Sequence, residues 1–498
     1  MRKHTIVLTI LCSILIVCPF TSALPSVNSR VVPDWSDGEF HGVWNKPNDQ
    51  TSGSFWGDLN QGRRATRGIF TGEWNLSGGT ATGTFRGIFY GMILVGQWDV
   101  TETGETNRFT GILQLNDTHF SVRLINPRTG LIDISGVHDA SFLPKLTGAY
   151  GVGVKTIHLV DENRSENFTV YDTKDVREVM VQLWYPINKT VLEPRFDYMD
   201  VPTFQWLKGR SPVPLVTIPD NAYQFVRPHG RNETMIASGV FPVIIFSPGY
   251  DGVYQIYTSF IEDLVSNGFV VASMNHPYVS GITVFPDGRT VGLASVPSDP
   301  VARTAFFNMS LRTIIEDAKF VLDTLSEMNA SDPDFSGHFD LSRVGMYGHS
   351  FGGANTAVCC YEDPRIIAGL TLDGVFYSSF IPGNITKPFL MMFAEARLAN
   401  DTTINYMWNH ITNDTFKMSI AGSTHFAYTD VGLLLTHLVP LIPPRILGFG
   451  KIPPKRMVNI TKTFETVFFE VYLKGEPVET LLDLPSYFPE VEFDYKLG

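Results

Sequence analysis

From about residue 146 onward, the chain alternates two hydrophobic patterns. Nearly continuous hydrophobic runs, such as Val-Phe-Pro-Val-Ile-Ile-Phe at 240–246, are typical of strands covered on both faces. Segment 310–328 instead places its hydrophobic residues at helical spacing on one face. We expect strands over 179–185, 240–246, 269–274, 344–347, 370–372, 389–393 and 416–420, and helices over 254–265, 310–328 and 461–473. Strands that alternate with helices predict an α/β fold with a mostly parallel, doubly wound sheet. The polar–apolar alternation of 179–185 favours the edge of that sheet.

Residues 34–145 follow a different pattern, in which glycine stands beside aromatic or β-branched residues. Examples are Gly-Val-Trp at 42–44, Gly-Glu-Trp at 72–74 and Gly-Gln-Trp at 96–98. With turn-rich spacers and no helical period, this pattern predicts a small antiparallel β-rich domain. Its aromatic residues either form the domain core, which is the commoner role, or bind a glycan or envelope polymer.

The N-terminus has the features of an export signal. Arg2 and Lys3 supply positive charge, 6–17 is hydrophobic, and Thr-Ser-Ala at 21–23 offers a small-residue cleavage site. The alternative, an uncleaved membrane anchor, is disfavoured because the hydrophobic run stops at Pro19, short of the ~20 residues that a bilayer requires. We therefore divide the chain into a signal peptide (1–23), a β-rich domain (34–145) and an α/β domain (146–498).

Twelve Asn-x-Ser/Thr sequons support export, since together they contain half of the asparagines. They lie at Asn75, Asn116, Asn163, Asn167, Asn188, Asn232, Asn308, Asn329, Asn384, Asn400, Asn413 and Asn459. This density predicts a secreted or cell-surface glycoprotein.

Charge and cysteine content narrow the function further. The net charge of −12 provides no basic surface for phosphates, which argues against a nucleic-acid partner. Once the signal is removed, only the neighbouring Cys359 and Cys360 remain. Adjacent cysteines rarely form a disulfide, so we expect two buried thiols on a helix.

The segment Gly348-His349-Ser350-Phe351-Gly352 carries the main chemical signal. It follows a predicted buried strand and opens a predicted helix, which is the setting of a nucleophile elbow. Small neighbours are needed where strand and helix approach closely around a strained serine. We therefore expect Ser350 to be a nucleophile at the end of a strand.

A serine hydroxyl needs a base, and an acid that orients the base. In this fold type the order along the chain is Ser, acid, His, each following a later strand. Asp373 and His425 are the expected acid and base. Alternative acids are Glu395 and Asp401, and alternative bases are His410 and His437, which lie in predicted helices.

An oxyanion that forms at the substrate carbonyl needs two N–H donors. The N–H of Phe351, at the helix N-terminus, is the first expected donor. The second should come from the loop after an earlier strand, Ser247-Pro248-Gly249-Tyr250. Because proline has no N–H, we expect Tyr250 to donate.

Several segments resemble the secreted platelet-activating-factor acetylhydrolase family. They are Gly-His-Ser-Phe-Gly-Gly at 348–353, Val-Gln-Leu-Trp-Tyr-Pro at 181–186, Phe-Ser-Pro-Gly at 246–249, Asn-Gly-Phe-Val-Val-Ala at 267–272 and Leu-Asp-Gly at 372–374. The resemblance covers about 146–475. It implies an α/β-hydrolase fold and hydrolysis of short or oxidised acyl esters without calcium, another metal or a cofactor. It also implies a triad of Ser350, Asp373 and His425, with oxyanion donors at Tyr250 and Phe351.

The family usually has His at the position of Pro248, and it has no counterpart of 34–145. Polyester hydrolases, cutinases and general lipases share the broader pattern and remain alternatives, as does a peptidase. A different alternative is a surface-binding protein in which 34–145 is the functional part. Segment 431–449 is strongly hydrophobic, and its prolines exclude a membrane-spanning helix. It forms either a lid or acyl-pocket wall that contacts lipid, or ordinary packing.

Overall fold

The computed structural model describes residues 36–498 apart from short segments. These are 47–50, 62–66, 78–80, 91–92, 117–118, 127–129, 139–142, 170–173, 189–194, 211–222, 224–225, 227, 233, 396, 398–400 and 439–443. The predicted signal peptide, 1–23, lies outside the described residues. In the described part, no helix combines the length and hydrophobicity needed to cross a membrane.

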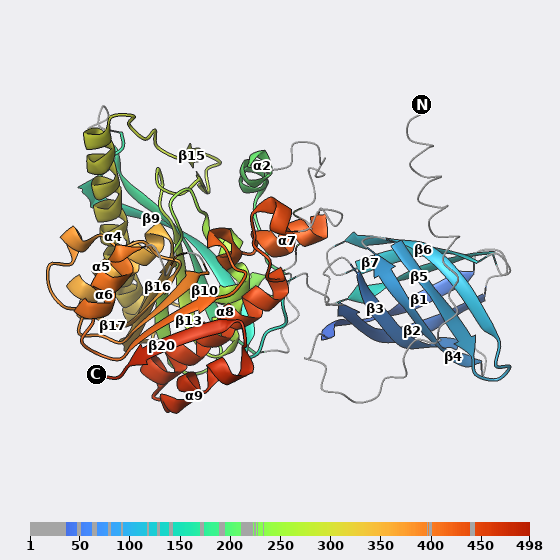
Figure 1. Ribbon diagram of the computed structural model, residues 1–498. Coiled ribbons are helices and arrows are strands. Elements are labelled where there is room, and N and C mark those ends of the chain that lie inside the picture. The colour runs from blue at the N-terminus through green and yellow to red at the C-terminus, as the bar shows by residue number, and fades with distance from the viewer. Residues whose placement is uncertain are drawn as a thin grey trace. The chain divides into compact units, whose positions relative to one another are not determined.

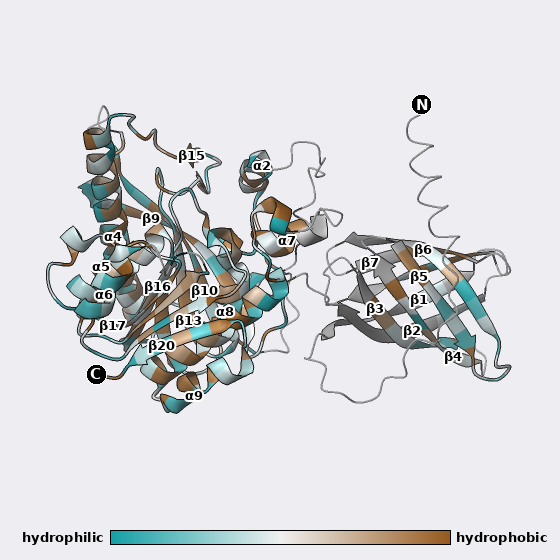
Figure 2. Cartoon of the chain, viewed as in Figure 1, coloured by the Kyte–Doolittle hydropathy of each residue, from teal (hydrophilic) through white to brown (hydrophobic). Residues whose placement is uncertain are grey.

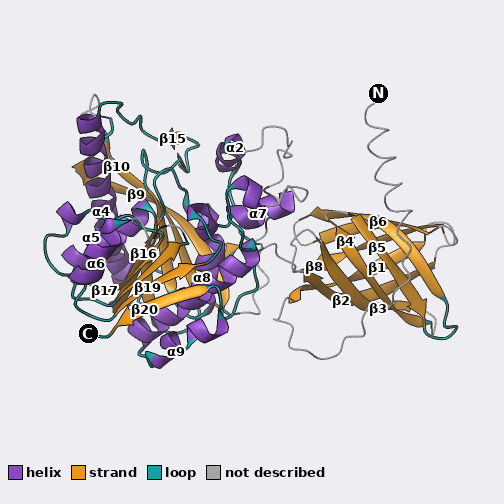
Figure 3. Ribbon diagram, in the orientation of Figure 1, coloured by secondary structure: helices purple, strands orange, loops and turns teal. Residues whose placement is uncertain are grey.

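The N-terminal strands form a closed antiparallel barrel in which each strand pairs with the next and β1 pairs with β8 (Figures 1 and 3). The strands are β1 (Ser36–Lys46), β2 (Thr51–Gln61), β3 (Arg67–Leu76), β4 (Thr82–Tyr90), β5 (Ile93–Val100), β6 (Thr106–Asn116), β7 (His119–Asn126) and β8 (Gly130–His138). The predicted antiparallel β-rich N-terminal part is confirmed. Closure pairs both outer strands and so removes the exposed edges that an open meander would leave.

Aromatic side chains fill the barrel, and glycines make room for them. Phe70 and Phe109 are buried in one hydrophobic cluster. A Cβ atom on Gly87 would lie 2.4 Å from the Phe70 ring, and one on Gly96 would lie 2.7 Å from the Phe109 ring. The glycine–aromatic pattern therefore reflects packing between neighbouring strands, and the structure places these aromatic residues in the core.

The remaining strands form a ten-stranded mixed sheet in the order β11-β9-β10-β13-β12-β16-β17-β18-β19-β20. Its strands are β9 (Gly151–Ser165), β10 (Val176–Ile187), β11 (Arg231–Asn232), β12 (Phe241–Ser247), β13 (Val270–Asn275), β16 (Phe339–His349), β17 (Ile366–Leu372), β18 (Phe389–Ala394), β19 (Thr415–Ile420) and β20 (Val491–Lys496). The strands from β13 to β19 in this order run parallel, whereas β9, β10 and β20 join antiparallel neighbours. A separate hairpin joins β14 (Ile282–Val284) to β15 (Thr290–Gly292).

Helices cover both faces of this sheet. The α-helices are α2 (Val201–Gly209), α3 (Thr258–Ser266), α4 (Pro300–Ser331), α5 (Phe351–Glu362), α6 (Thr402–His410), α7 (Val431–Leu438), α8 (Pro454–Phe469) and α9 (Glu479–Leu482). Val243 and Ile245 of β12 pack in one core cluster with α4, α5 and α6, whereas Ile244 and Phe246 pack in another with α3 and α8. Successive strand residues face opposite sides of a sheet, so the two clusters mark its two faces. Figure 2 shows α8 and α9 with hydrophobic residues beside hydrophilic ones, as such packing requires.

Three expectations about the elements were wrong, and one of them is the start of the last long helix, α8, which lies at Pro454 and not at 461. β10 is not an edge strand, because β9 continues the sheet beyond it and buries even Gln182. Helix α4 begins ten residues before the expected 310, at Pro300, where Asp299 accepts a hydrogen bond from the N–H of Ala302 at 2.8 Å. Its first turns are largely exposed and so lack the one-sided hydrophobic pattern.

Candidate active site

Ser350 occupies a sharp turn between β16 and α5. Its backbone has φ 55° and ψ −113°, a strained conformation for a residue with a side chain. The N–H of Ser350 donates to the carbonyl of Leu372 at 2.9 Å, and its own carbonyl accepts from Val375 at 3.2 Å. These two bonds fasten the turn to the segment that follows β17.

Glycines allow the turn to form because backbone atoms take the space of their side chains. A Cβ atom on Gly348 would lie 2.3 Å from the carbonyl carbon of Gly352. A Cβ atom on Gly352 would lie 2.0 Å from the carbonyl oxygen of Ser247. Both separations are far below van der Waals contact, so this close packing of α5 on β12 and β16 requires glycine.

Asp373 follows β17 directly and contacts His425. The Nδ1 atom of His425 lies 2.5 Å from Oδ2 of Asp373, and the N–H of Ala394 donates to Oδ1 at 3.0 Å. Burial works to raise the pKa of Asp373, but these hydrogen bonds and the nearby Arg397 outweigh it and hold the pKa below its ordinary value. Asp373 is therefore an ionised acceptor for the His425 N–H.

His425 is the first residue of a 3-10 turn, η4 (His425–Tyr428), that follows β19. Its side chain remains 35% exposed, whereas Asp373 is buried. Ser350, Asp373 and His425 thus follow three parallel strands of one sheet at their carboxyl ends, where the ligand sites of open α/β sheets lie.

The alternative acids and bases have other contacts. Glu395 accepts the N–H of Gly422 at 3.1 Å, and Asp401 caps the N-terminus of α6. His410, on α6, contacts the carbonyl of Tyr406 at 2.8 Å through Nδ1. His437 belongs to α7, and its side chain lies outside the described residues.

The loop after β12, which carries the expected donor Tyr250, lies against the elbow. A Cβ atom on Gly249 would come within 3.1 Å of the Ser350 Cβ. The ring of Tyr250 meets that of Phe351 edge to face, with centroids 6.0 Å apart. The side chains of the two expected donor residues are therefore in contact, and the loop that carries Tyr250 lies next to Ser350.

His349 and Tyr257 are site residues that the sequence did not identify. The imidazole of His349 lies against that of His425, with centroids 4.5 Å apart and the ring planes tilted by 35°. Its Nε2–H donates to the His425 carbonyl at 3.0 Å, and its Nδ1 accepts from the Tyr257 hydroxyl at 2.9 Å. Burial, followed by the charge of His425, lowers the pKa of His349 to about 3, so this imidazole is neutral.

Arg397 is a third such residue. Its Nη1 donates to the carbonyl oxygen of Asp373 at 2.7 Å and lies 3.5 Å from the Asp373 carboxylate. It also pairs with Asp401 at 3.2 Å. No local pattern identifies Arg397, because its role depends on contact with a residue 24 positions earlier.

One further expectation concerns the two cysteines. Cys359 and Cys360 are free, buried thiols on α5, as predicted. Among the described residues, no group of three or more His, Cys, Asp or Glu side chains could hold a metal ion.

Comparison with known proteins identifies the family. The model of platelet-activating factor acetylhydrolase, isoform II, matches residues 135–286 and 317–475, which include every residue of the constellation above. A probable 1-alkyl-2-acetylglycerophosphocholine esterase of Arthroderma benhamiae is 25% identical over 72% of this chain and 95% of its own. A platelet-activating factor acetylhydrolase of Cavia porcellus is 24% identical over 66% of this chain and 78% of its own. The structure of a ferulic acid esterase from Streptomyces cinnamoneus is similar, with a TM-score of 0.59 and 27% identity over 70% of this chain and 98% of that one. The chain therefore belongs to the platelet-activating factor acetylhydrolase, isoform II family of ester hydrolases.

Proposed function

We propose that the protein is a secreted serine hydrolase that removes short or oxidised acyl groups from phospholipids of the platelet-activating-factor type. The observation that carries this proposal is the contact between Asp373 and His425 beside the strained Ser350 turn. The names of the relatives support the phospholipid substrate.

The reaction proceeds in two steps of acyl transfer. His425 removes the Ser350 hydroxyl proton through Nε2 while Ser350 Oγ attacks the ester carbonyl. Asp373 keeps the other imidazole proton on Nδ1, which leaves Nε2 as the acceptor. The protonated His425 then gives its proton to the departing alcohol, and an acyl-enzyme remains on Ser350. Water, deprotonated by the same histidine, releases the acid and restores the serine.

Stabilisation of the tetrahedral oxyanion comes from the N–H groups of Tyr250 and Phe351. Fixed donors of this kind stabilise charge that develops only in the transition state. The N-terminal end of α5 adds the favourable partial charge of its helix dipole.

Aromatic side chains beside the nucleophile support a short acyl group. The rings of Tyr250, Phe307 and Tyr377 surround Phe351, with centroid distances of 6.0, 6.1 and 5.9 Å. We propose that this close-packed group of rings, which adjoins the residue after Ser350, limits the length of acyl chain that the site accepts. The same rings suit an aromatic acid, and the ferulic acid esterase neighbour makes hydroxycinnamoyl esters the second candidate substrate class.

Secretion and glycosylation form part of the proposal. Asn163, Asn188, Asn232 and Asn384 are exposed and accessible to an oligosaccharide transferase. Asn329 makes both of its amide hydrogen bonds with the backbone of Phe339, at 2.9 and 3.0 Å, and is a poor acceptor. Glycosidase treatment should therefore increase the electrophoretic mobility of the secreted protein. Each Gln variant of the first four asparagines should give part of that increase, and Asn329→Gln should give none.

Parts of the segment 431–449 pack in the protein interior. Leu433, Leu434 and Leu435 are buried, as are Leu447 and Phe449, whereas Ile446 is 67% exposed. We propose that Ile446 marks the part of this segment that meets lipid. A glycan-binding role for 34–145 stays a prediction.

The test is hydrolysis of p-nitrophenyl esters from acetate to palmitate, together with methyl ferulate, in EDTA. Wild type is compared with Ser350→Ala. Activity that depends on Ser350 and falls beyond short chains supports the proposal. A preference for ferulate would favour the second candidate, a rise with chain length would favour a lipase, and activity that persists in Ser350→Ala would refute the mechanism.

A further inference from the structure

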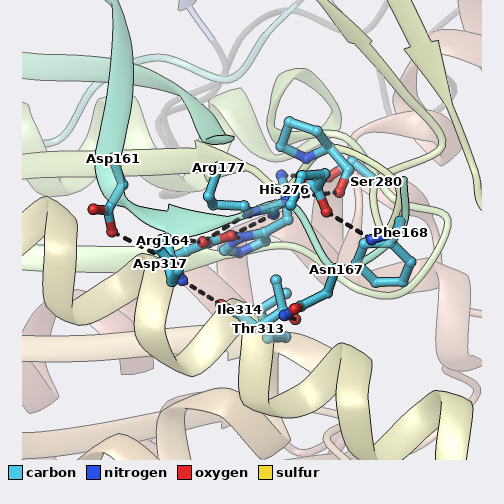
Figure 4. Close-up of polar contacts among 12 residues, drawn as sticks. Asp161, Arg164, Asn167, Phe168, Arg177, His276, Ser280, Thr313, Ile314 and Asp317 are labelled. Atoms are coloured by element: carbon cyan, nitrogen blue, oxygen red, sulfur yellow. Dashed lines mark hydrogen bonds and ion pairs between the residues drawn. The ribbon is translucent and has the colours of Figure 1, made fainter. Parts of the chain in front are cut away.

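A second set of buried polar residues adjoins the loop 247–250, which we call the oxyanion loop. These residues take no part in the reaction above. Figure 4 shows its outer part, where Arg164, Arg177 and His276 converge on Asp317 of α4. Arg177 binds the Asp317 carboxylate with two bonds of 3.0 and 2.6 Å, and Arg164 approaches it at 2.6 Å. The Nδ1 atom of His276 lies 2.8 Å from the same carboxylate. All but Arg164 are almost completely buried.

The inner part of this set reaches the elbow. His276 Nε2 lies 3.0 Å from the hydroxyl oxygen of Ser247, the last residue of β12. The same oxygen accepts a hydrogen bond from Nδ2 of Asn355 at 3.2 Å. Asn355 belongs to α5, the helix that begins directly after Ser350.

Chemistry fixes the direction of each hydrogen bond. Burial works to raise the pKa of Asp317, but Arg177 and His276 outweigh it and hold the carboxyl ionised, so Asp317 can only accept. Burial lowers the pKa of His276, which favours the neutral ring with its proton on Nδ1. His276 Nε2 must then accept from the Ser247 hydroxyl, whose lone pair accepts from the Asn355 amide. Every donor in this series has an acceptor.

These residues are hydrogen-bonded in the series serine, histidine, aspartate that the proposed triad also has, but Ser247 cannot be a second nucleophile. Its exposed fraction is 0%, and those of His276 and Asp317 are 1% and 0%. A substrate carbonyl therefore has no access to the Ser247 hydroxyl. We therefore expect these residues to act by fixing the position of neighbouring groups.

Ser247 directly precedes Pro248, Gly249 and Tyr250. Its backbone carbonyl packs so closely on Gly352 that a Cβ atom there would lie 2.0 Å away. Its side chain is bonded to α4 through His276 and to α5 through Asn355. The start of the oxyanion loop is thus fixed against the helix that supplies the Phe351 N–H.

We propose that Ser247, His276 and Asp317 form a buried positioning relay that sets the separation between the N–H groups of Tyr250 and Phe351. The inference rests on the proposed function, because it assigns these two groups to the oxyanion. The three are positioning residues, since none of them touches the substrate.

The consequence is a specific kinetic signature. Oxyanion donors act on charge that exists in the transition state, so misplacing them lowers kcat and leaves substrate binding largely unchanged. Loss of one such donor costs about 10²- to 10³-fold in kcat, and a displaced donor should cost less. We expect Ser247→Ala and His276→Gln to lower kcat on p-nitrophenyl acetate at least about tenfold, with KM within about twofold.

The matched control is Ser310→Ala. Ser310 is equally buried on α4, but its hydroxyl donates only within its helix, to the carbonyl of Phe306 at 2.8 Å. This variant removes the same hydroxyl from the core without touching the oxyanion loop. Its kcat should equal that of wild type, and thermal unfolding identifies any loss that comes from stability alone.

A second variant keeps the inference testable if Ser247→Ala fails to fold. Asn355→Leu keeps the number of side-chain heavy atoms and removes the donor to Ser247, together with the bond from the same amide to the Ile314 carbonyl at 3.1 Å. It should reproduce the loss of kcat at constant KM. In the double variant with Ser247→Ala, the combined loss should be smaller than the product of the two single losses, because both substitutions remove the Ser247–Asn355 hydrogen bond.

Four outcomes separate this inference from the proposed function. A selective loss of kcat in Ser247→Ala, His276→Gln and Asn355→Leu supports the relay. Wild-type kcat in these variants, beside an inactive Ser350→Ala, overturns the relay and leaves the proposed function intact. A rise in KM that matches the fall in kcat also overturns it. Activity that survives in Ser350→Ala overturns the proposed function itself.

Discussion

The Nδ1 atom of His425 lies 2.5 Å from Oδ2 of Asp373, although 52 residues separate them in the chain. The parallel sheet produces this contact, because the segments after β17 and β19 emerge at the same edge with only β18 between them. The N–H of Ala394, at the end of β18, completes the environment by donating to the other Asp373 oxygen. One carboxylate thus joins three consecutive strands of the sheet.

This contact predicts the effect of Asp373→Asn. An amide NH₂ group facing His425 would force Nδ1 to accept, so that Nε2 carries the proton and cannot deprotonate Ser350. We expect kcat to fall about 10³- to 10⁴-fold, with unchanged unfolding temperature, as for other triads. Steady-state kinetics on p-nitrophenyl acetate provide the measurement. Asp401→Asn is the control for the alternative acid, and a larger loss there would reassign the role.

Arg397 should matter through its hold on Asp373. In Arg397→Met the Asp373 carbonyl loses its donor and the carboxylate loses a cation 3.5 Å away. We expect about a tenfold loss of kcat, equivalent to about 1.4 kcal/mol. Arg365→Met is a matched control, since Arg365 pairs with Asp323 and Asp363 near the other end of β17. Equal effects of the two substitutions would contradict a positioning role.

The neutral His349 predicts a pH dependence of stability. Its folded-state pKa of about 3 lies below the unfolded value of about 6.5, so the unfolded chain binds more protons between these limits. Its stabilising contribution is complete above pH 6.5 and is lost as the pH falls, by about 1.4 kcal/mol per pH unit. The free energy of unfolding, measured with urea from pH 4 to 7, should therefore rise less steeply with pH in His349→Gln than in wild type. An unchanged slope for His349→Gln, with the partly exposed His338→Gln as the control, would refute this assignment.

The elbow itself can be tested through its packing. Gly352→Ala would place a methyl group 2.0 Å from the Ser247 carbonyl oxygen, so α5 must move or strain. We expect a loss of about 2 kcal/mol or more in the free energy of unfolding, together with reduced activity. Gly292→Ala meets no atom within 4 Å and should be neutral. Equal stability of the two variants in urea would contradict the geometry.

Local sequence patterns were sufficient to predict an element or a residue's role where that role depends on neighbours in the sequence. The continuous hydrophobic runs identified the parallel strands, and glycines around Ser350 identified the elbow, because close packing there excludes any side chain. The order of Ser350, Asp373 and His425 along the chain follows from the order of the strands. The inner position of β10 was missed because β9 is far longer and more polar than the expected strands.

Contacts between residues far apart in the chain could not be predicted from the sequence. Tyr257 reaches His349 across 92 residues, and Asp317 reaches His276 across 41. Neither pair has a spacing that suggests contact, because each joins elements that only the tertiary fold brings together. Closure of the barrel is similar: β1 pairs with β8, in the register Trp44 to Ile134, which no turn between them specifies.

The most direct test of the central claim is to locate the residue that a fluorophosphonate modifies. Such a reagent reacts with an activated serine, and peptide mass spectrometry identifies the labelled residue. Ser350 should carry one phosphonyl group per chain, labelling should parallel the loss of esterase activity, and His425→Ala should label far more slowly. A label on another serine, or full inactivation with Ser350 unmodified, would contradict the assignment of Ser350 as the nucleophile.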